Sequence, residues 1–128
     1  MSYHFTKAWR GSFEEAINRV VEALKSEGFG VLTEIDVKAT LKKKLDVDFK
    51  NYRILGACNP HFAYQALQAE DKIGTMLPCN VIVQETGEGT VEVSAVDPVA
   101  SMQAIRNPQL EAIATQVRTK LQRVISSL

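Results

Sequence analysis

Two cysteines are the residues of this chain with the clearest potential for chemistry. Cys58 and Cys79 could form a reversible dithiol pair or supply soft sulfur ligands to a metal ion. Polar residues lie beside both cysteines in the sequence, and an aspartate ahead of a proline offers a carboxylate. The candidate ligand-binding rim consists of six residues: Cys58, Asn59, His61, Cys79, Asn80 and Asp97.

The same residues also fit a purely structural interpretation. Cysteine is often buried and behaves as a small hydrophobe, and the spacing of these two does not match a zinc ribbon. His61 is typical of an exposed residue in a first helical turn, whereas Asn59 and Asn80 fit a helix cap and the start of a strand. Three interpretations of the two thiols are therefore kept: packing residues, a dithiol pair and a metal site. We assign no metal.

Recognisable catalytic motifs are absent from the sequence. It contains no nucleophile elbow, no phosphate-binding glycine loop, no paired carboxylates and no HExxH pattern. Gly28 and Gly30 flank a predicted helix end instead of following a strand, so they do not form a dinucleotide fingerprint. We therefore assign no catalytic residue and no cofactor.

The overall composition narrows the class of protein. The chain has 128 residues, with 15 basic and 15 acidic side chains and a formal net charge of zero. A balanced charge argues against a nucleic-acid partner, and this length suits one domain spanning residues 1–128. The apolar runs are short and no secretory signal precedes the first predicted strand, so we expect a soluble, cytoplasmic protein without membrane association.

The hydrophobic periodicity predicts alternating strands and helices. Strands are expected over residues 3–10, 30–37, 51–57, 79–86 and 90–96. Helices are expected over residues 13–27, 38–46, 60–72 and 108–126, with a helical turn over 98–104. Ser12 and Glu15 form a capping box for the first helix, Gly74 is expected to end the third, and the glycines at 87 and 89 indicate a hairpin.

This order of elements predicts an α+β fold. Consecutive strands usually pair, and the two long amphipathic helices must cover one face of the resulting antiparallel sheet. The opposite face is expected to be partly apolar, with contributions from Tyr3, Trp9 and Tyr52. An uncovered face with aromatic side chains indicates a partner surface, and we expect a homodimer.

The predicted sheet would also gather the candidate residues. If the strands over 51–57, 79–86 and 90–96 form an antiparallel meander, the end of the first, the start of the second and the end of the third meet at one rim. Cys58, Cys79 and Asp97 would then share that rim. Because two helices also begin there, their positive ends would favour an anion. We expect an anion or another small molecule as the ligand of this rim.

Several of these residues carry a family resemblance. The relevant runs are Gly56-Ala57-Cys58-Asn59-Pro60, Ala66-Leu67, Leu77-Pro78-Cys79-Asn80-Val81-Ile82-Val83, and Asp97-Pro98 ahead of Met102. In these runs, and over nearly its whole length, the chain resembles domain of unknown function family 302 (DUF 302). The resemblance implies a fold like the TATA-binding-protein domain, in the order β-α-β(4)-α, and a homodimer. It implies no established activity, and the fold itself does not imply DNA binding.

Two functions are compatible with these observations. We favour a small homodimeric binding or interaction module without catalysis, because a partner surface is expected and a catalytic set is missing. The alternative is a thiol-based redox or metal-responsive protein that uses Cys58 and Cys79, assisted by His61 or Asp97. No motif supports a hydrolase or a transferase.

Overall fold

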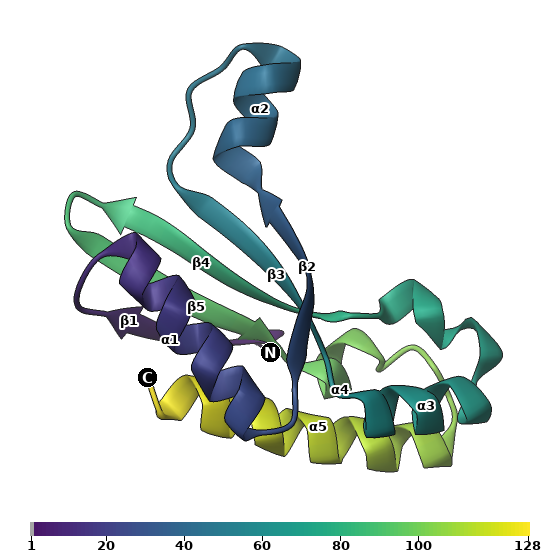
Figure 1. Cartoon of the computed structure of the whole chain (residues 1–128). Coiled ribbons are helices and arrows are strands. Elements are labelled where there is room, and N and C mark those ends of the chain that lie inside the picture. The colour runs from purple at the N-terminus through teal and green to yellow at the C-terminus, as the bar shows by residue number, and fades with distance from the viewer. Residues whose placement is uncertain (1) are drawn as a thin grey trace.

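Within residues 2–128, which the computed structural model describes, five strands form one antiparallel sheet in the order β1-β5-β4-β3-β2 (Figure 1). The strands are β1 (His4–Trp9), β2 (Gly30–Asp36), β3 (Tyr52–Cys58), β4 (Cys79–Gly87) and β5 (Thr90–Val96). The helices are α1 (Phe13–Ser26), α2 (Val37–Leu45), α3 (Pro60–Ala69), α4 (Pro98–Ser101) and α5 (Pro108–Ser126), and η1 (Asp71–Met76) is a 3-10 helix. The predicted α+β class and the order of elements are confirmed.

The two long helices, α1 and α5, pack on the same face of the sheet (Figure 1). The main core lies between this face and the helices, and its fully buried side chains include Val20, Leu24, Leu55, Val93 and Leu121. At the start of α1, Ser12 Oγ accepts a hydrogen bond of 3.1 Å from the Glu15 amide, as the capping box predicts. The sequence therefore placed the helical layer correctly.

The third helix is shorter than predicted. Gly74 does not end it, because α3 already stops at Ala69 and Gly74 lies within η1. Glu70 adopts an extended conformation, and its carboxylate accepts a hydrogen bond from the Lys72 amide to start η1. Asn107 Nδ2 donates to the Ala69 carbonyl at 2.8 Å, which fixes the end of α3 against the start of α5.

Of the three aromatic residues expected on the sheet face opposite the helices, one lies elsewhere. Trp9 lies on the helix-covered face, because it pairs with the buried Val91 and packs against the main core. Tyr3 and Tyr52 do line the open face, around a concavity of about 400 Å³. The open face is therefore less aromatic than the sequence suggested.

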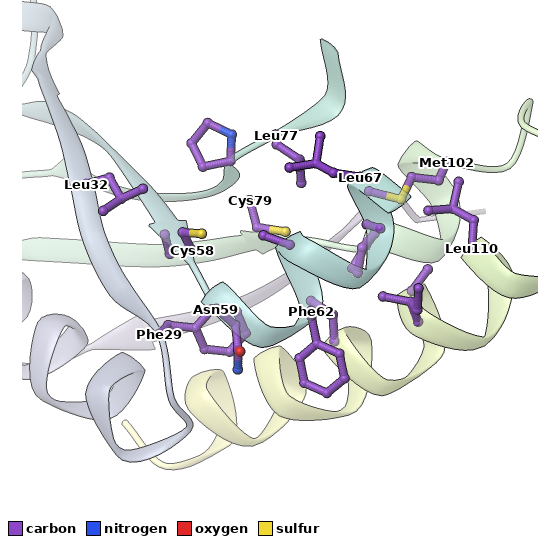
Figure 2. Close-up of a pocket in the computed structure, with 18 residues that line it drawn as sticks. Phe29, Leu32, Cys58, Asn59, Phe62, Leu67, Leu77, Cys79, Met102 and Leu110 are labelled. Carbon is purple, nitrogen blue, oxygen red and sulfur yellow. The ribbon is translucent and has the colours of Figure 1, made fainter. Parts of the chain in front are cut away.

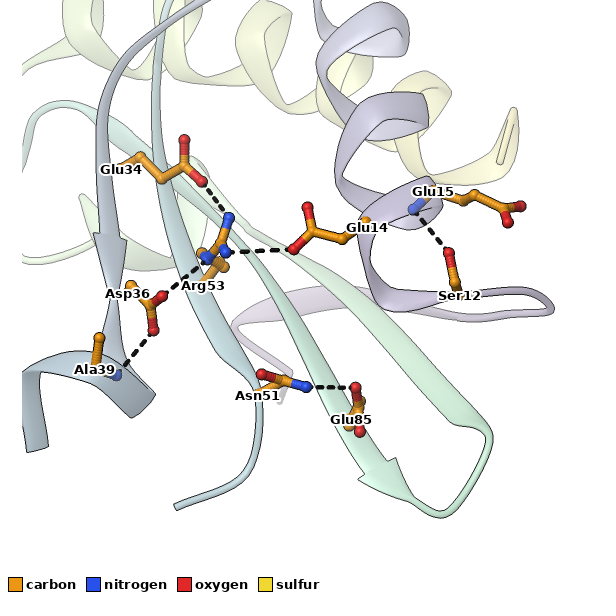
Figure 3. A network of polar contacts seen from close by, with 9 residues as sticks. All are labelled: Ser12, Glu14, Glu15, Glu34, Asp36, Ala39, Asn51, Arg53 and Glu85. Atoms are coloured by element: carbon orange, nitrogen blue, oxygen red, sulfur yellow. Dashed lines mark hydrogen bonds and ion pairs between the residues drawn. The ribbon is translucent and has the colours of Figure 1, made fainter. Parts of the chain in front are cut away.

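Helix α2 and the loop after it form an arm, residues 37–50, that stands away from the rest of the molecule (Figure 1). The helix contains no buried residue, and Leu45 is 66% exposed. Figure 3 shows how the arm is anchored at its base: Arg53 contacts Glu34 at 2.7 Å and Asp36 at 3.5 Å. Asp36 also accepts a hydrogen bond from the Ala39 amide at 3.0 Å, which caps α2.

No helix in the part of the chain described by the structure combines the length and the apolar character needed to cross a membrane.

Candidate functional site

An apolar cavity of about 300 Å³ lies between α3, α5 and the ends of β3 and β4 (Figure 2). Phe62, Ala66, Leu110 and Val117 line its helical side. Leu32, which is largely exposed, lies at its outer edge. Apart from the two thiols, Asn59 contributes the only polar side chain among the lining residues that the structure describes. Such a lining favours an apolar occupant.

The meander β3-β4-β5 brings the two cysteines to this cavity, as its topology predicts. Ala57 pairs directly with Cys79 across β3 and β4, and Cys58 is the next residue along β3. Figure 2 shows Cys58 and Cys79 at the adjoining ends of their strands. Both are free thiols; Cys79 is buried and Cys58 is half-buried.

Burial controls the chemistry of the inner thiol. Removal from water raises the pKa of Cys79 to about 11, and the neighbouring Cys58 adds to this increase. Cys79 is therefore a neutral thiol at physiological pH, and the neutral form is a poor nucleophile. This property suits the wall of an apolar cavity better than a reactive centre.

Asn59 has a different role from the predicted one. It occupies the N-cap position of α3, but its side chain makes no capping hydrogen bond. Its Nδ2 instead donates to the Glu27 carbonyl at 3.4 Å and lies against Gly28 at the end of α1. Asn59 is 8% exposed, and its side chain ties the start of α3 to the end of the first helix.

Asp97 is buried beside the cavity but does not line it. Its carboxylate accepts hydrogen bonds from the Val99 and Ala100 amides and so caps α4. It also lies 3.2 Å from Nε of Arg118 on α5, which forms an ion pair. Its neighbour Pro98 does line the cavity. Asp97 therefore positions the cavity wall.

The remaining two candidate residues lie outside the cavity. His61 is exposed in the first turn of α3. Asn80 follows Cys79 in β4, and because successive strand side chains alternate, it faces the open side of the sheet. The structure thus brings Cys58, Asn59 and Cys79 together, with Asp97 behind them.

The sequence did not reveal the helical wall of the cavity. Ala63 and Ala66 on α3 face Ala114 on α5, and these small side chains leave space between the helices. Met102, after α4, closes the same space and is buried. The sequence offered one signal for this cavity: several alanines occupy helix positions that should face a core.

Comparisons with other proteins support one family. The profile of the family described as "Domain of unknown function DUF302" matches residues 5–128. A crystal structure of an uncharacterized conserved DUF302 protein from Bacillus stearothermophilus is 31% identical, with a TM-score of 0.90 and coverage of 98% of each chain. No curated protein matches the chain.

Proposed function

The chain belongs to the DUF302 family, for which no function is established, and we propose from its cavity that it is a binding module for a small apolar ligand. The observation that carries the proposal is the apolar cavity of about 300 Å³ between α3, α5 and the sheet. Ligand sites in proteins are typically concave, mostly apolar and supplied with few polar groups. Asn59 and the two thiols supply those few groups here.

The charge distribution supports an uncharged ligand. Among the described residues, no Lys, Arg, Asp, Glu or His side chain lines the cavity. The high pKa of Cys79 keeps that thiol neutral as well. A charged ligand would lose its hydration without gaining a partner ion, which is costly in an apolar cavity. A neutral, largely hydrocarbon ligand avoids this cost.

A titration with a neutral fluorescent probe, 1-aminoanthracene, tests the proposal. We expect saturable binding at one site per chain and an increase in melting temperature on addition of the probe. Ala63→Leu places a larger side chain in the cavity and should weaken binding at least about tenfold, the effect of about 1.4 kcal/mol.

Ala112→Leu is the matched control, because Ala112 lies on α5 but is exposed and does not line the cavity. Both substitutions exchange alanine for leucine in a helix, so their intrinsic helix propensities change equally. Equal probe affinity in the two variants would reject the cavity as the binding site.

A thiol-based function remains the alternative, since two cysteines from different strands lie in one cavity wall. Its metal-responsive form receives little support, because within residues 2–128 no three His, Cys, Asp or Glu side chains are placed to hold a metal ion. Its redox form requires a thiolate, which the burial of Cys79 disfavours.

Alkylation of the folded, reduced protein with iodoacetamide separates these functions. If the cavity serves only to bind a ligand, Cys79 should stay unmodified at pH 8 and react only as the pH approaches about 11. Mass spectrometry of tryptic peptides would identify the modified cysteine. Rapid modification of Cys79 at pH 8 would favour the redox function.

We also propose that the chain self-associates. Large exposed apolar side chains concentrate on β2 and the arm: Leu32, Ile35, Leu45, Val47 and Phe49. Light scattering from the protein at micromolar concentration should give a molecular mass twice that of one chain, as expected for a homodimer. Phe49→Glu should shift the protein toward the chain mass, whereas a wild-type monomer would contradict this proposal.

A further inference from the structure

A second cavity, of about 240 Å³, lies between the start of α5 and the segment formed by α4 and the turn after it. It adjoins the apolar cavity, because Met102, Leu110 and Ala114 line both spaces. All three residues are buried. Figure 2 shows Met102 and Leu110 on the side of the apolar cavity that lies away from Cys58 and Asn59. The second cavity therefore extends the apolar cavity on the side away from Asn59.

The sequence of α5 explains why the two cavities share a wall. Successive residues of a helix are turned by about 100°, so Leu110 and Ala114 lie in one row along its surface. Val117, on one side of this row, lines the apolar cavity. Glu111 and Thr115, on the other side, line the second cavity. One helix therefore presents an apolar flank to the first space and a polar flank to the second.

The second cavity differs from the apolar cavity in its polar side chains. Gln103, Glu111 and Thr115 line it, and in the described part of the chain Glu111 is its only charged residue. The Thr115 hydroxyl donates to the Glu111 carbonyl at 2.9 Å, which leaves lone pairs of the Thr115 oxygen free to accept. The ionised Glu111 carboxylate is also an acceptor. These groups match a ligand group that donates a hydrogen bond.

We propose that the ligand of the apolar cavity is a neutral amphiphile, with its hydrocarbon part between α3 and α5 and a terminal hydroxyl group in the second cavity. This inference rests on the proposed binding function, and it adds the class of the ligand and its orientation. The Met102 side chain is the movable part of the shared wall, because methionine is unbranched and has three rotatable bonds. A ligand that turns this side chain aside occupies both spaces.

The charge of Glu111 selects the head group. A carboxylate on the ligand would meet a like charge there, which is unfavourable. An ammonium group would meet an opposite charge, but Glu111 lies in the first turn of α5, where the positive end of the helix already offsets part of that charge. The ammonium group would also lose hydration beside the buried Met102 and Leu110. A hydroxyl group donates a hydrogen bond and has neither cost.

Isothermal titration calorimetry of the full chain with three ligands of equal hydrocarbon length tests the head group. The ligands are decanol, decanoate and decylamine, each at concentrations where it is monomeric. Decanol should bind at one site per chain and at least about tenfold more tightly than either charged ligand. Equal or tighter binding of decanoate or decylamine would overturn the assignment of a neutral head group.

Thr115→Val removes one hydroxyl group from the second cavity and should weaken decanol binding about threefold to tenfold, the effect of one hydrogen bond. Thr119→Val is the matched control, because the Thr119 hydroxyl also donates to the carbonyl four residues earlier, but Thr119 lines neither cavity. The affinity for 1-aminoanthracene, which we expect in the apolar cavity, should be the same in both variants. Equal decanol affinity in the two variants would overturn the assignment of the second cavity.

A crystal structure of the decanol complex decides the orientation of the ligand. Its hydroxyl oxygen should lie within hydrogen-bond distance of Thr115 or Glu111, with the Met102 side chain turned aside. A hydroxyl group beside Asn59 or Cys79 would overturn this inference and leave the proposed function intact. Binding of 1-aminoanthracene without binding of decanol would also overturn this inference alone, whereas failure of both ligands to bind would reject the proposed function as well.

Discussion

The connections β2-β3 and β3-β4 each contain a short α-helix, and the two helices differ in how they pack against the rest of the molecule. Helix α2 has 9 residues and buries none of them, whereas α3 has 10 residues and packs on α5. The difference lies in where each connection leaves the sheet. The start of α3 lies beside the long C-terminal helix, while α2 projects past the other end of the strands (Figure 1). Only the position of α3, beside α5, can enclose a cavity.

The comparison also shows two ways to fix a helix. The ends of α3 are held by Asn59 and Asn107, whose side chains bond to carbonyl groups of neighbouring segments. The arm depends on the cluster around Arg53 (Figure 3), in which the carboxylate partners Glu34 and Asp36 are each 44% exposed. Exposed ion pairs contribute little to stability. We therefore expect the arm to open locally more readily than the cavity wall.

Leucine truncation should show the largest difference between the two regions. Leu110→Ala removes a fully buried side chain at the cavity and should lower the free energy of unfolding by about 2–5 kcal/mol. Leu45→Ala on the arm should change it by less than about 0.5 kcal/mol in the Phe49→Glu background, in which the chain is expected to be monomeric. Urea unfolding of both variants measures this difference, and comparable losses would show that the arm is packed in solution.

A methyl group added at the strand end beside the cavity should have a smaller effect. At Gly56, a Cβ would overlap Thr33 Oγ1 and lie 2.7 Å from Pro78 Cγ. Gly56→Ala should therefore cost about 1–3 kcal/mol. Gly30→Ala is the control, because a Cβ there meets no atom within 4 Å. If both variants unfold at the same urea concentration, Gly56 is not tightly enclosed.

The smallest effect is expected from the ion pair that joins the end of α1 to α5. Hydrogen bonds from Arg123, at 2.9 and 3.1 Å, lower the pKa of Glu27 below its ordinary value near 4.5. The resulting stability is complete above that ordinary value and is lost as the pH falls through the lower folded-state pKa. The melting temperatures of wild type and Glu27→Gln should therefore differ near neutral pH and become equal in acid. A difference in melting temperature that does not change with pH would show that the ion pair between Glu27 and Arg123 is not its cause.

The sequence was sufficient for most of the fold. Regular periodicity placed every strand and both long helices, and the glycines at 87 and 89 marked the hairpin that Gly89 completes with a φ of +74°. Trp9 was assigned to the wrong face, because its register with Val91 depends on a strand far away in sequence. Side-chain direction within a strand follows from pairing, which local patterns do not specify.

The site could be predicted only in part. The meander implied that Cys58 and Cys79 lie at one end of the sheet, and both line the cavity there, because the ends of adjacent antiparallel strands coincide. Asn80 was grouped with them by proximity in sequence, although alternation turns it to the opposite face. The cavity itself depends on the packing of α3 on α5 and on Asn107 binding Ala69, which are tertiary features.

A crystal structure determined under xenon pressure would test most directly whether the space between α3 and α5 is a true apolar binding cavity. Xenon enters dry, apolar cavities and avoids polar ones. We predict a xenon atom among Ala63, Ala66 and Leu110, with no shift of the sheet. Ordered water in that position, bonded to Asn59 or to the thiols, would contradict the account, as would a collapsed space that admits no xenon.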